Sequence, residues 1–201
     1  MVTVTECTTL GKGRLRFHLD NGTELVLYRG EAKQFRMREG STLSDEEEHQ
    51  LIYEVVGKRA KRRTMHLLEQ MDRTEQQLRE KLKQGGYPQA CIDLALEYVK
   101  SFHYVDDYRY ACTYINYRQD RMSRYQLKVK LYGKGVSGEL IDRALEECYE
   151  GDEQDQIIRL LEKKKFDAQN SDPKEFTRVY QYLMRRGFRS NDVLHAMKSK
   201  Q

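Results

Sequence analysis

The sequence has no tryptophan and only two prolines among its 201 residues. Because proline interrupts helices, its scarcity favours long helical segments. No stretch approaches the roughly 18 consecutive apolar residues that a membrane-spanning helix needs, so we expect no membrane partner. The N-terminus also lacks the basic start and apolar block of a secretory signal, and we therefore expect a cytoplasmic protein.

Motifs that carry chemistry are missing as well. The four cysteines, Cys7, Cys91, Cys112 and Cys148, form no Cys-x-x-Cys pair, which favours reduced and mostly buried thiols. The five histidines are scattered, and the sequence contains neither a Walker loop nor a dinucleotide fingerprint. We therefore predict a protein that is not an enzyme, needs no cofactor or metal, and takes no small-molecule substrate.

Charges of both signs are abundant and nearly balanced. The chain has 36 Lys and Arg against 32 Asp and Glu, which gives a formal net charge of +4, and its isoelectric point is about 8.7. A dedicated DNA-binding domain usually has an isoelectric point above ~9 with its cations on one face. The charge balance therefore permits an acidic or nucleic-acid partner without requiring one.

Residues 1–43 have the period-two pattern of a small β-sheet domain. Asn21-Gly22 separates two alternating runs and is a strong hairpin signal, because both residues tolerate positive φ. A hairpin alone is marginal in water, so the sheet must pack on something or contact a partner. We expect strands at residues 3–5, 14–19, 23–28 and 33–38.

A helix is predicted directly after this sheet. Ser44 and Glu47 have the spacing of a capping box, in which each side chain accepts a hydrogen bond from the other residue's backbone. The acids of the first turn also suit the positive end of the helix dipole. Residues 44–57 are therefore expected to form a helix that connects the sheet to the rest of the chain.

One helical pattern then recurs three times. Each copy has a leucine, a glycine four residues later, an apolar or aromatic residue directly after the glycine, and an alanine thirteen residues after the leucine. The copies lie 49 and 52 residues apart, and a period near 50 indicates stacked helical units. The leucines are Leu82, Leu131 and Leu183, and the glycines are Gly86, Gly135 and Gly187.

The repeated glycines are predicted to be left-handed helix caps. A glycine in this conformation pays no Cβ penalty, and in a Schellman motif the residue after it contacts the leucine four positions before it. Ser137, Ser190 and Asp172 are expected to be helix N-caps, and Pro88 and Pro173 are expected in first turns. We predict a mostly helical protein with three tandem three-helix repeats, at 58–104, 105–151 and 152–201, in an elongated and curved arrangement after the small antiparallel sheet.

Several motifs resemble the RecX family of bacterial recombination regulators over essentially the whole chain. They are the LDNG hairpin, KRAKRR, DRTEQQLREKL, FHYVDDYRYA, the Lys134-Gly135-Val136 turn and the final MRRGF. The resemblance implies tandem three-helix repeats that lodge in the groove of the RecA filament on single-stranded DNA. It also implies inhibition of ATP hydrolysis and strand exchange and modulation of coprotease activity, with roles in DNA repair and the SOS response. The N-terminal sheet resembles that of longer, Gram-positive-type members.

Two basic clusters are candidates for partner binding. The first lies at the start of repeat one and could meet an acidic protein surface or DNA phosphate, although most charge runs are simply solvated. The second flanks the last glycine, where cations also favour the end of a helix by about 0.3–1 kcal/mol for local reasons. The first cluster is Lys58, Arg59, Lys61, Arg62 and Arg63; the second is Arg185, Arg186 and Arg189, to which the turn residue Lys134 is added.

The tyrosine-rich segment 104–117 allows two interpretations. Tyr residues at helical spacing, among them Tyr110, Tyr114 and Tyr117, are more often packed between helices than used to stack bases. Other side chains of the segment are expected to face outward as binding residues. Adjacent acids at a helix start are explained by capping and the dipole, so we reject a metal site at Asp106-Asp107. The outward candidates are Tyr104, Tyr108, Arg109 and Arg118.

Two functions from different classes remain open. The first is an interaction protein that binds a recombinase filament and regulates it. The alternative is a nucleic-acid-binding module that grips single- or double-stranded DNA directly through its basic helix–turn joints. The acids Glu139, Asp142, Glu146 and Glu147 beside the second turn favour a protein partner, because DNA would repel them.

Overall fold

The computed structural model describes residues 1–199. The chain divides into two compact units, Met1–Asp106 and Asp107–Gln201, and each has its own hydrophobic core. The prediction of a mostly helical chain with a small N-terminal antiparallel sheet is confirmed. Residues 200 and 201, the end of the predicted third repeat, lie outside the described part.

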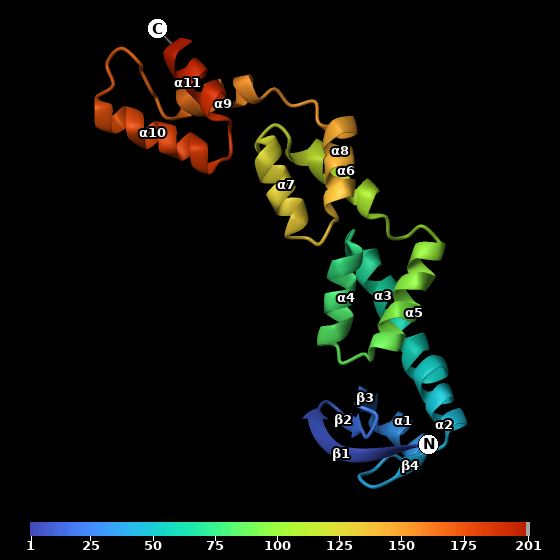
Figure 1. Ribbon diagram of the computed structural model, residues 1–201. Coiled ribbons are helices and arrows are strands. Elements are labelled where there is room, and N and C mark those ends of the chain that lie inside the picture. Colours follow the sequence, from blue (N-terminus) through green and yellow to red (C-terminus); the bar gives the residue numbers. More distant parts are fainter. Residues whose placement is uncertain (200–201) are drawn as a thin grey trace. The chain divides into compact units, whose positions relative to one another are not determined.

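The sheet has four antiparallel strands in the order β3-β2-β1-β4. They are β1 (Val2–Gly11), β2 (Arg14–Leu19), β3 (Glu24–Tyr28) and β4 (Thr42–Leu43). Phe17 in the middle of β2 pairs with Cys7 of β1 and Leu25 of β3, and its side chain is fully buried. The alternation seen in residues 14–19 therefore does place one face of the strand in the core. Figure 1 labels the strands of this sheet.

The β2–β3 hairpin forms as predicted, but only one of its two turn residues has positive φ. Gly22 has φ +80°, whereas Asn21 does not have a positive φ. The Gly22 N–H donates to the Leu19 carbonyl (3.0 Å), and Leu19 N–H donates to Thr23 carbonyl (2.9 Å). This is the three-residue hairpin loop, in which a turn is followed by one left-handed residue.

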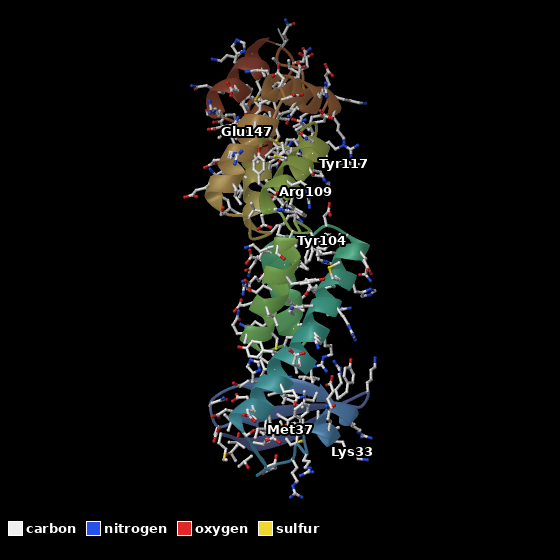
Figure 2. The ribbon with its side chains drawn as sticks, turned by 90° about the vertical axis from the view of Figure 1, so that its right-hand side faces the viewer. Lys33, Met37, Tyr104, Arg109, Tyr117 and Glu147 are labelled. Atoms are coloured by element: carbon white, nitrogen blue, oxygen red, sulfur yellow. The ribbon has the colours of Figure 1, made fainter. Side chains whose placement is uncertain are left out.

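The predicted strand at 33–38 is wrong. The segment instead belongs to the end of α1 (Arg29–Gln34) and the turn that follows it, and the fourth strand is β4. The Met37 N–H donates to the Ala32 carbonyl (2.8 Å) across Arg36, which is left-handed with φ +51°. Buried Ala32 and Phe35 lie three residues apart, which is the spacing of one helix face, and the segment follows this helical pattern and not the alternation of a strand. Lys33 and Met37 of this segment are labelled in Figure 2.

A helical run follows the sheet through α2 (Asp45–His49), the π-helix η1 (Gln50–Gly57) and α3 (Lys58–Gln70). The predicted capping box is present: the Ser44 hydroxyl accepts from the Glu47 N–H (3.1 Å) and the Glu47 carboxylate accepts from the Ser44 N–H (2.9 Å). The π segment was not predicted. At its end, a Cβ on Gly57 would lie 2.8 Å from Leu94 of the helix at Gln89–Ser101, so the glycine allows η1 to pack closely on that helix.

The first unit is completed by α4 (Glu75–Gln84) and α5 (Gln89–Ser101), which pack with α3 as the first three-helix repeat. Thr74 caps α4 with a second capping box. Pro88 is expected in the first turn of α5, but the structure places it at the N-cap, directly before the first helical residue. Cys91 is buried in this core, its thiol donates to the Ile52 carbonyl of η1 (3.2 Å), and burial raises its pKa to about 11.

The second unit contains two further groups of three helices. They are α6 (Asp107–Arg118), α7 (Arg124–Tyr132) and α8 (Gly138–Cys148), then α9 (Glu153–Lys163), α10 (Pro173–Arg185) and α11 (Ser190–Ser199). Ser137 and Asp172 are N-caps as predicted. Ser190 is instead the first residue of its helix, and its hydroxyl pairs with that of Tyr180 (3.0 Å).

The three repeated glycines take the same backbone conformation, which the predicted cap requires. Their φ angles are +76° for Gly86, +82° for Gly135 and +78° for Gly187. In the first two copies the N–H of the residue after the glycine donates to the repeat leucine, from Tyr87 to the Leu82 carbonyl (3.3 Å) and from Val136 to the Leu131 carbonyl (3.2 Å). These bonds are the outer hydrogen bond of the Schellman motif.

Two of these glycines are also places where a neighbouring element approaches closely. A Cβ on Gly86 would lie 2.4 Å from the Val26 side chain of β3, and a Cβ on Gly187 would lie 2.2 Å from the ring of Tyr125 at the start of α7. The Ser123 hydroxyl, which caps α7, donates to the carbonyl of Arg186 in the same turn (2.6 Å). The third cap is therefore packed against the second repeat within the second unit.

Three of the described helices end in the same motif without a glycine: α1, through the Arg36 turn given above, and two more. His103 after α5 and Lys165 after α9 have φ +56° and +54°. The next residue in each case closes the outer hydrogen bond, from Tyr104 N–H to the Val99 carbonyl (2.9 Å) and from Phe166 N–H to the Leu161 carbonyl (3.0 Å). A side chain at such a position costs about 1–2 kcal/mol relative to a right-handed conformation.

Replacing Gly187 by Val should lower the free energy of unfolding by about 2 kcal/mol or more, because a β-branched residue opposes positive φ and its Cβ would overlap Tyr125. Gly133→Ala is the control, since Gly133 is right-handed with φ −63° and a Cβ there meets only ordinary contacts at 3.5 Å. Urea unfolding of the two variants measures the difference, and equal midpoints would contradict the cap assignment.

Replacing Lys165 by Gly should stabilise the protein by about 0.5–1 kcal/mol, since relief of the left-handed backbone exceeds the extra entropy of an unfolded glycine. The same change at Lys163, in the last turn of α9, should instead destabilise by up to about 1 kcal/mol. Thermal melts of the two variants should therefore shift in opposite directions from wild type; a shift in the same direction would contradict the assignment.

Candidate functional site

The cations of the first predicted basic cluster divide between pairs inside the first unit and the exposed surface. The Lys58 ammonium pairs with the Glu54 carboxylate one helical turn earlier (2.5 Å). The half-buried Arg59 guanidinium pairs with Glu31 of α1 and donates to the Val26 carbonyl of β3. Two of the five predicted cations are therefore already paired inside the first unit.

Arg59 joins the sheet to the first repeat. Its guanidinium carbon lies 5.0 Å from the ring centre of Tyr28, the last residue of β3, and 5.5 Å from that of Tyr87 in the first glycine cap. A guanidinium is suited to this position because its planar fork bonds a carboxylate and a carbonyl while its faces stack on rings. The structure thus places Arg59 in a joint between two elements.

The other three cations of this cluster remain available at the surface. Lys61 extends over the ring of Tyr98 on α5, with 5.1 Å between its nitrogen and the ring centre. Arg62 and Arg63 are exposed, and neither forms an ion pair within residues 1–199. These three side chains are the part of the predicted cluster that a partner could contact.

An exposed row of aromatic rings lies at the end of α5. The ring centres of Tyr98 and Phe102 are 5.0 Å apart, and those of Phe102 and Tyr104 are 5.8 Å apart and nearly parallel. Tyr104, labelled in Figure 2, was predicted as an outward residue, but Tyr98 and Phe102 were not. Their spacing of four residues on a helix was the signal that could have identified them.

The predicted residues of α6 divide between packing and the surface. The Tyr108 hydroxyl donates to Glu147 of α8, and this hydrogen bond raises the pKa of the phenol. The Arg143 guanidinium covers the same ring at 4.4 Å and pairs with Glu147 (2.8 Å), which lowers the pKa of that carboxyl. Tyr108 is therefore committed to the contact between α6 and α8.

Arg109 and Arg118 of α6 are exposed, and the Arg118 guanidinium stacks on Tyr114 at 5.8 Å. The helical spacing of the tyrosines predicts that Tyr117 packs between helices, but its side chain is 85% exposed, so this prediction is wrong for Tyr117. Arg109, Tyr117 and Glu147 are labelled in Figure 2. Helical spacing alone could not decide this, because Tyr114 and Tyr117 lie three residues apart while only the former packs against the core.

The cations of the second and third glycine turns have different surroundings. Lys134 is half-buried, with its nitrogen 5.8 and 5.3 Å from the ring centres of Tyr110 and Tyr114. Arg186 is half-buried and stacks on Tyr182 at 4.9 Å, whereas Arg185 and Arg189 are exposed. Arg186 also lines a concave surface.

A basic crevice of about 500 Å³ lies in the second unit between its two repeats. Four cations and one carboxylate line it, and none of the four forms an ion pair within the described residues. Gln156 at its wall is buried and donates to the Gln119 carbonyl (2.6 Å), while its own amide oxygen has no hydrogen-bond partner among residues 1–199. The lining residues are Asp120, Arg121, Gln156, Arg159, Leu160, Lys163 and Arg186.

Sequence reasoning found only Arg186 among the four cations of this basic crevice. Arg121 follows α6, Arg159 and Lys163 are on α9, and Arg186 ends α10, so no run of charge marks them. The one available signal was the spacing of four residues between Arg159 and Lys163, which puts both on one helix face. The crevice adds three cations to the candidate residues.

A cleft of about 810 Å³ lies in the first unit between the β2–β3 hairpin, α2 and the first glycine cap. Several of its polar groups are already paired: the Asn21 amide donates to Glu48 (2.9 Å) and Glu24 pairs with Arg16 (3.1 Å). Over residues 1–199, no group of three or more His, Cys, Asp or Glu is arranged to hold a metal ion. In the same described range, no helix is both long and apolar enough to cross a bilayer.

Comparison with known proteins gives the same family for all three repeats. Models of the first, second and third three-helix domains of RecX match residues 60–98, 106–145 and 151–197. A protein named "Regulatory protein RecX" from Caldanaerobacter subterraneus subsp. tengcongensis is 29% identical, with 80% of each chain covered. A protein of the same name from Clostridium acetobutylicum is 25% identical, with 98% of this chain and 94% of the relative covered.

A solved structure, "Crystal structure of regulatory protein RecX", has the same fold as this chain. The TM-score is 0.66 at 21% sequence identity, and the comparison covers 99% of this chain and all of that one. The three domain models occur here in their family order, each on one of the three helical groups described above. This chain is therefore a member of the RecX family of regulatory proteins.

Proposed function

We propose that this protein binds the RecA filament formed on single-stranded DNA and inhibits its ATPase, strand-exchange and coprotease activities. Its membership of a family of regulatory proteins supports a role exerted on a partner. Its surface supports binding, because the candidate residues are cations and exposed rings. In this proposal the protein works in the cytoplasm, binds no cofactor and catalyses no reaction of its own.

The observation that carries the proposal is the basic crevice. Four cations without acidic partners face one concavity, although the chain as a whole is nearly neutral. Arginine guanidinium groups form paired hydrogen bonds with carboxylates and phosphates, both of which a nucleoprotein filament presents. Unpaired cations also raise the rate of encounter with an acidic partner.

The direct test is RecA's DNA-dependent ATPase at increasing amounts of the pure protein. A protein that lodges in the filament should suppress hydrolysis at less than one molecule per RecA subunit, because one bound copy spans several subunits or blocks filament growth. Suppression only at equimolar or higher ratios would favour titration of free RecA. Unchanged ATPase would contradict the proposal.

Reversing the charges of Arg159 and Lys163 to Glu should weaken inhibition of the RecA ATPase about ten-fold or more, because acids would then line the crevice. The matched control is Lys174→Glu with Arg178→Glu, which makes the same change of charge at the same spacing on exposed positions of α10. The control should inhibit like wild type. Equal loss in both double variants would show that net charge matters and the crevice does not.

Direct binding to DNA is the second candidate function, and the unpaired cations of the crevice are the observation that favours it. At physiological salt the protein should bind RecA-coated single-stranded DNA at least about ten-fold more tightly than the bare strand, since 32 acids oppose 36 bases. Fluorescence anisotropy with both substrates measures the ratio. Equal affinities, with a steep loss of both on adding salt, would favour the DNA-binding module.

A further inference from the structure

An exposed apolar stripe lies on the outer face of α7, and of its residues only Tyr125 takes part in a contact described so far. Tyr125, Val129 and Tyr132 are spaced by four and three residues, so they share one face of the helix. Their exposed fractions are 59%, 49% and 49%. The opposite face holds the fully buried Leu127 and Leu131, and α6 and α8 pack on α7 (Figure 1).

The other two repeats show that the fold does not need this stripe. The repeat offsets of 49 and 52 residues align the stripe with positions in α4 and α10, which have the same buried leucines and the same glycine cap. Apart from Met184, which packs against its own core, those positions are polar and exposed. They are Gln76, Glu80 and Lys83 in the first repeat, and Thr177, Gln181 and Met184 in the third.

Contacts within the second unit explain some of the large apolar residues of the stripe but not all of them. Tyr125 packs against the backbone at Gly187, which accounts for an aromatic residue there. The Tyr132 hydroxyl lies near Gly138, where an added Cβ would be 2.5 Å away, but half of the side chain still faces solvent. Val129 is half exposed with no such neighbour, and its counterparts Glu80 and Gln181 are polar.

The rim of the stripe is positively charged. Helix α7 carries Arg124, Lys128 and Lys130 and has no acidic residue. Lys128 pairs with Asp142 of α8, whereas Lys130 is exposed and has no ion pair in the described part of the chain. An apolar stripe of two tyrosines with a basic rim complements a surface that is apolar at its centre and acidic at its edges.

We propose that the outer face of α7 is a docking site for an apolar segment with acidic flanks on a protein partner. The inference rests on the proposed function and deepens it, since it gives the middle repeat the apolar anchor of the filament contact. Val129 and Tyr132 supply the buried centre, and Lys130 with Arg124 supplies the charged edge. The first and third repeats contribute polar contacts at the corresponding positions.

The test replaces Val129 by Glu and, separately, by Lys, because Glu80 shows that the same scaffold accepts a long charged residue at this position. Binding of each variant to RecA-coated single-stranded DNA is measured at physiological salt. Val129→Glu should weaken binding about ten-fold or more, because it puts an acid where an apolar contact with acidic flanks is made. Val129→Lys should weaken it clearly less.

Gln181→Glu is the matched control, as it introduces the same acid at the corresponding position of the third repeat. It should bind within about two-fold of wild type, and all variants should melt like wild type. If Val129→Glu unfolds, Val129→Gln, which copies the third repeat, replaces it and should also weaken binding. Binding of the folded Glu variant at wild-type strength would overturn the docking site while leaving the proposed function intact.

Other outcomes identify other occupants. If Val129→Glu and Val129→Lys weakened binding to RecA-coated DNA equally, the proposal that the partner segment has acidic flanks would be overturned. A wild-type dimer in sedimentation that Val129→Glu converts to a monomer would make the stripe an interface between two copies and overturn the proposal. Failure of the wild-type protein itself to bind RecA-coated DNA would instead remove the proposed function on which the inference rests.

Discussion

The left-handed glycine at the end of the middle helix of each repeat is the constraint on which the rest of the structure depends. It reverses the chain after α4, α7 and α10, and in the first two repeats the N–H of the next residue donates to the carbonyl of the repeat leucine. At Gly86 and Gly187 the missing side chain also leaves the space that Val26 and Tyr125 occupy. One residue type therefore both ends the helix and admits a neighbouring element, and an alanine could do neither without strain.

Because the caps and cores are alike, the repeats differ mainly in what they expose. The third repeat contributes three of the four cations of the basic crevice, and the second carries the apolar stripe of α7. In the first repeat, Arg59 is bonded to the N-terminal sheet and its helix α1. A repeated scaffold allows such specialisation, since exposed positions change at small cost to the free energy of unfolding while buried ones do not. The candidate functions accordingly lie on exposed positions, and the buried ones are shared.

Local sequence patterns predicted most of the fold but only part of the candidate site. Glycine caps, capping boxes and helical repeats are encoded within a few residues, so Ser44, Asp172 and the three glycines could be assigned directly. Residues 33–38 failed because alternation over six residues is also compatible with a helix end. The basic crevice was missed for a different reason: its cations come from separate helices, and only packing brings them together.

Arg59 has a consequence for how relatives of this protein can diverge. Its guanidinium, Glu31 and the Val26 carbonyl form one joint, and Val26 also fills the space over Gly86. In a homologue without the sheet, selection on residue 59 would be relaxed, whereas the glycine would still be retained for its backbone angle. Arginine at this position and glycine at the cap should therefore follow separate evolutionary histories, the first inherited together with the sheet and the second with every copy of the repeat.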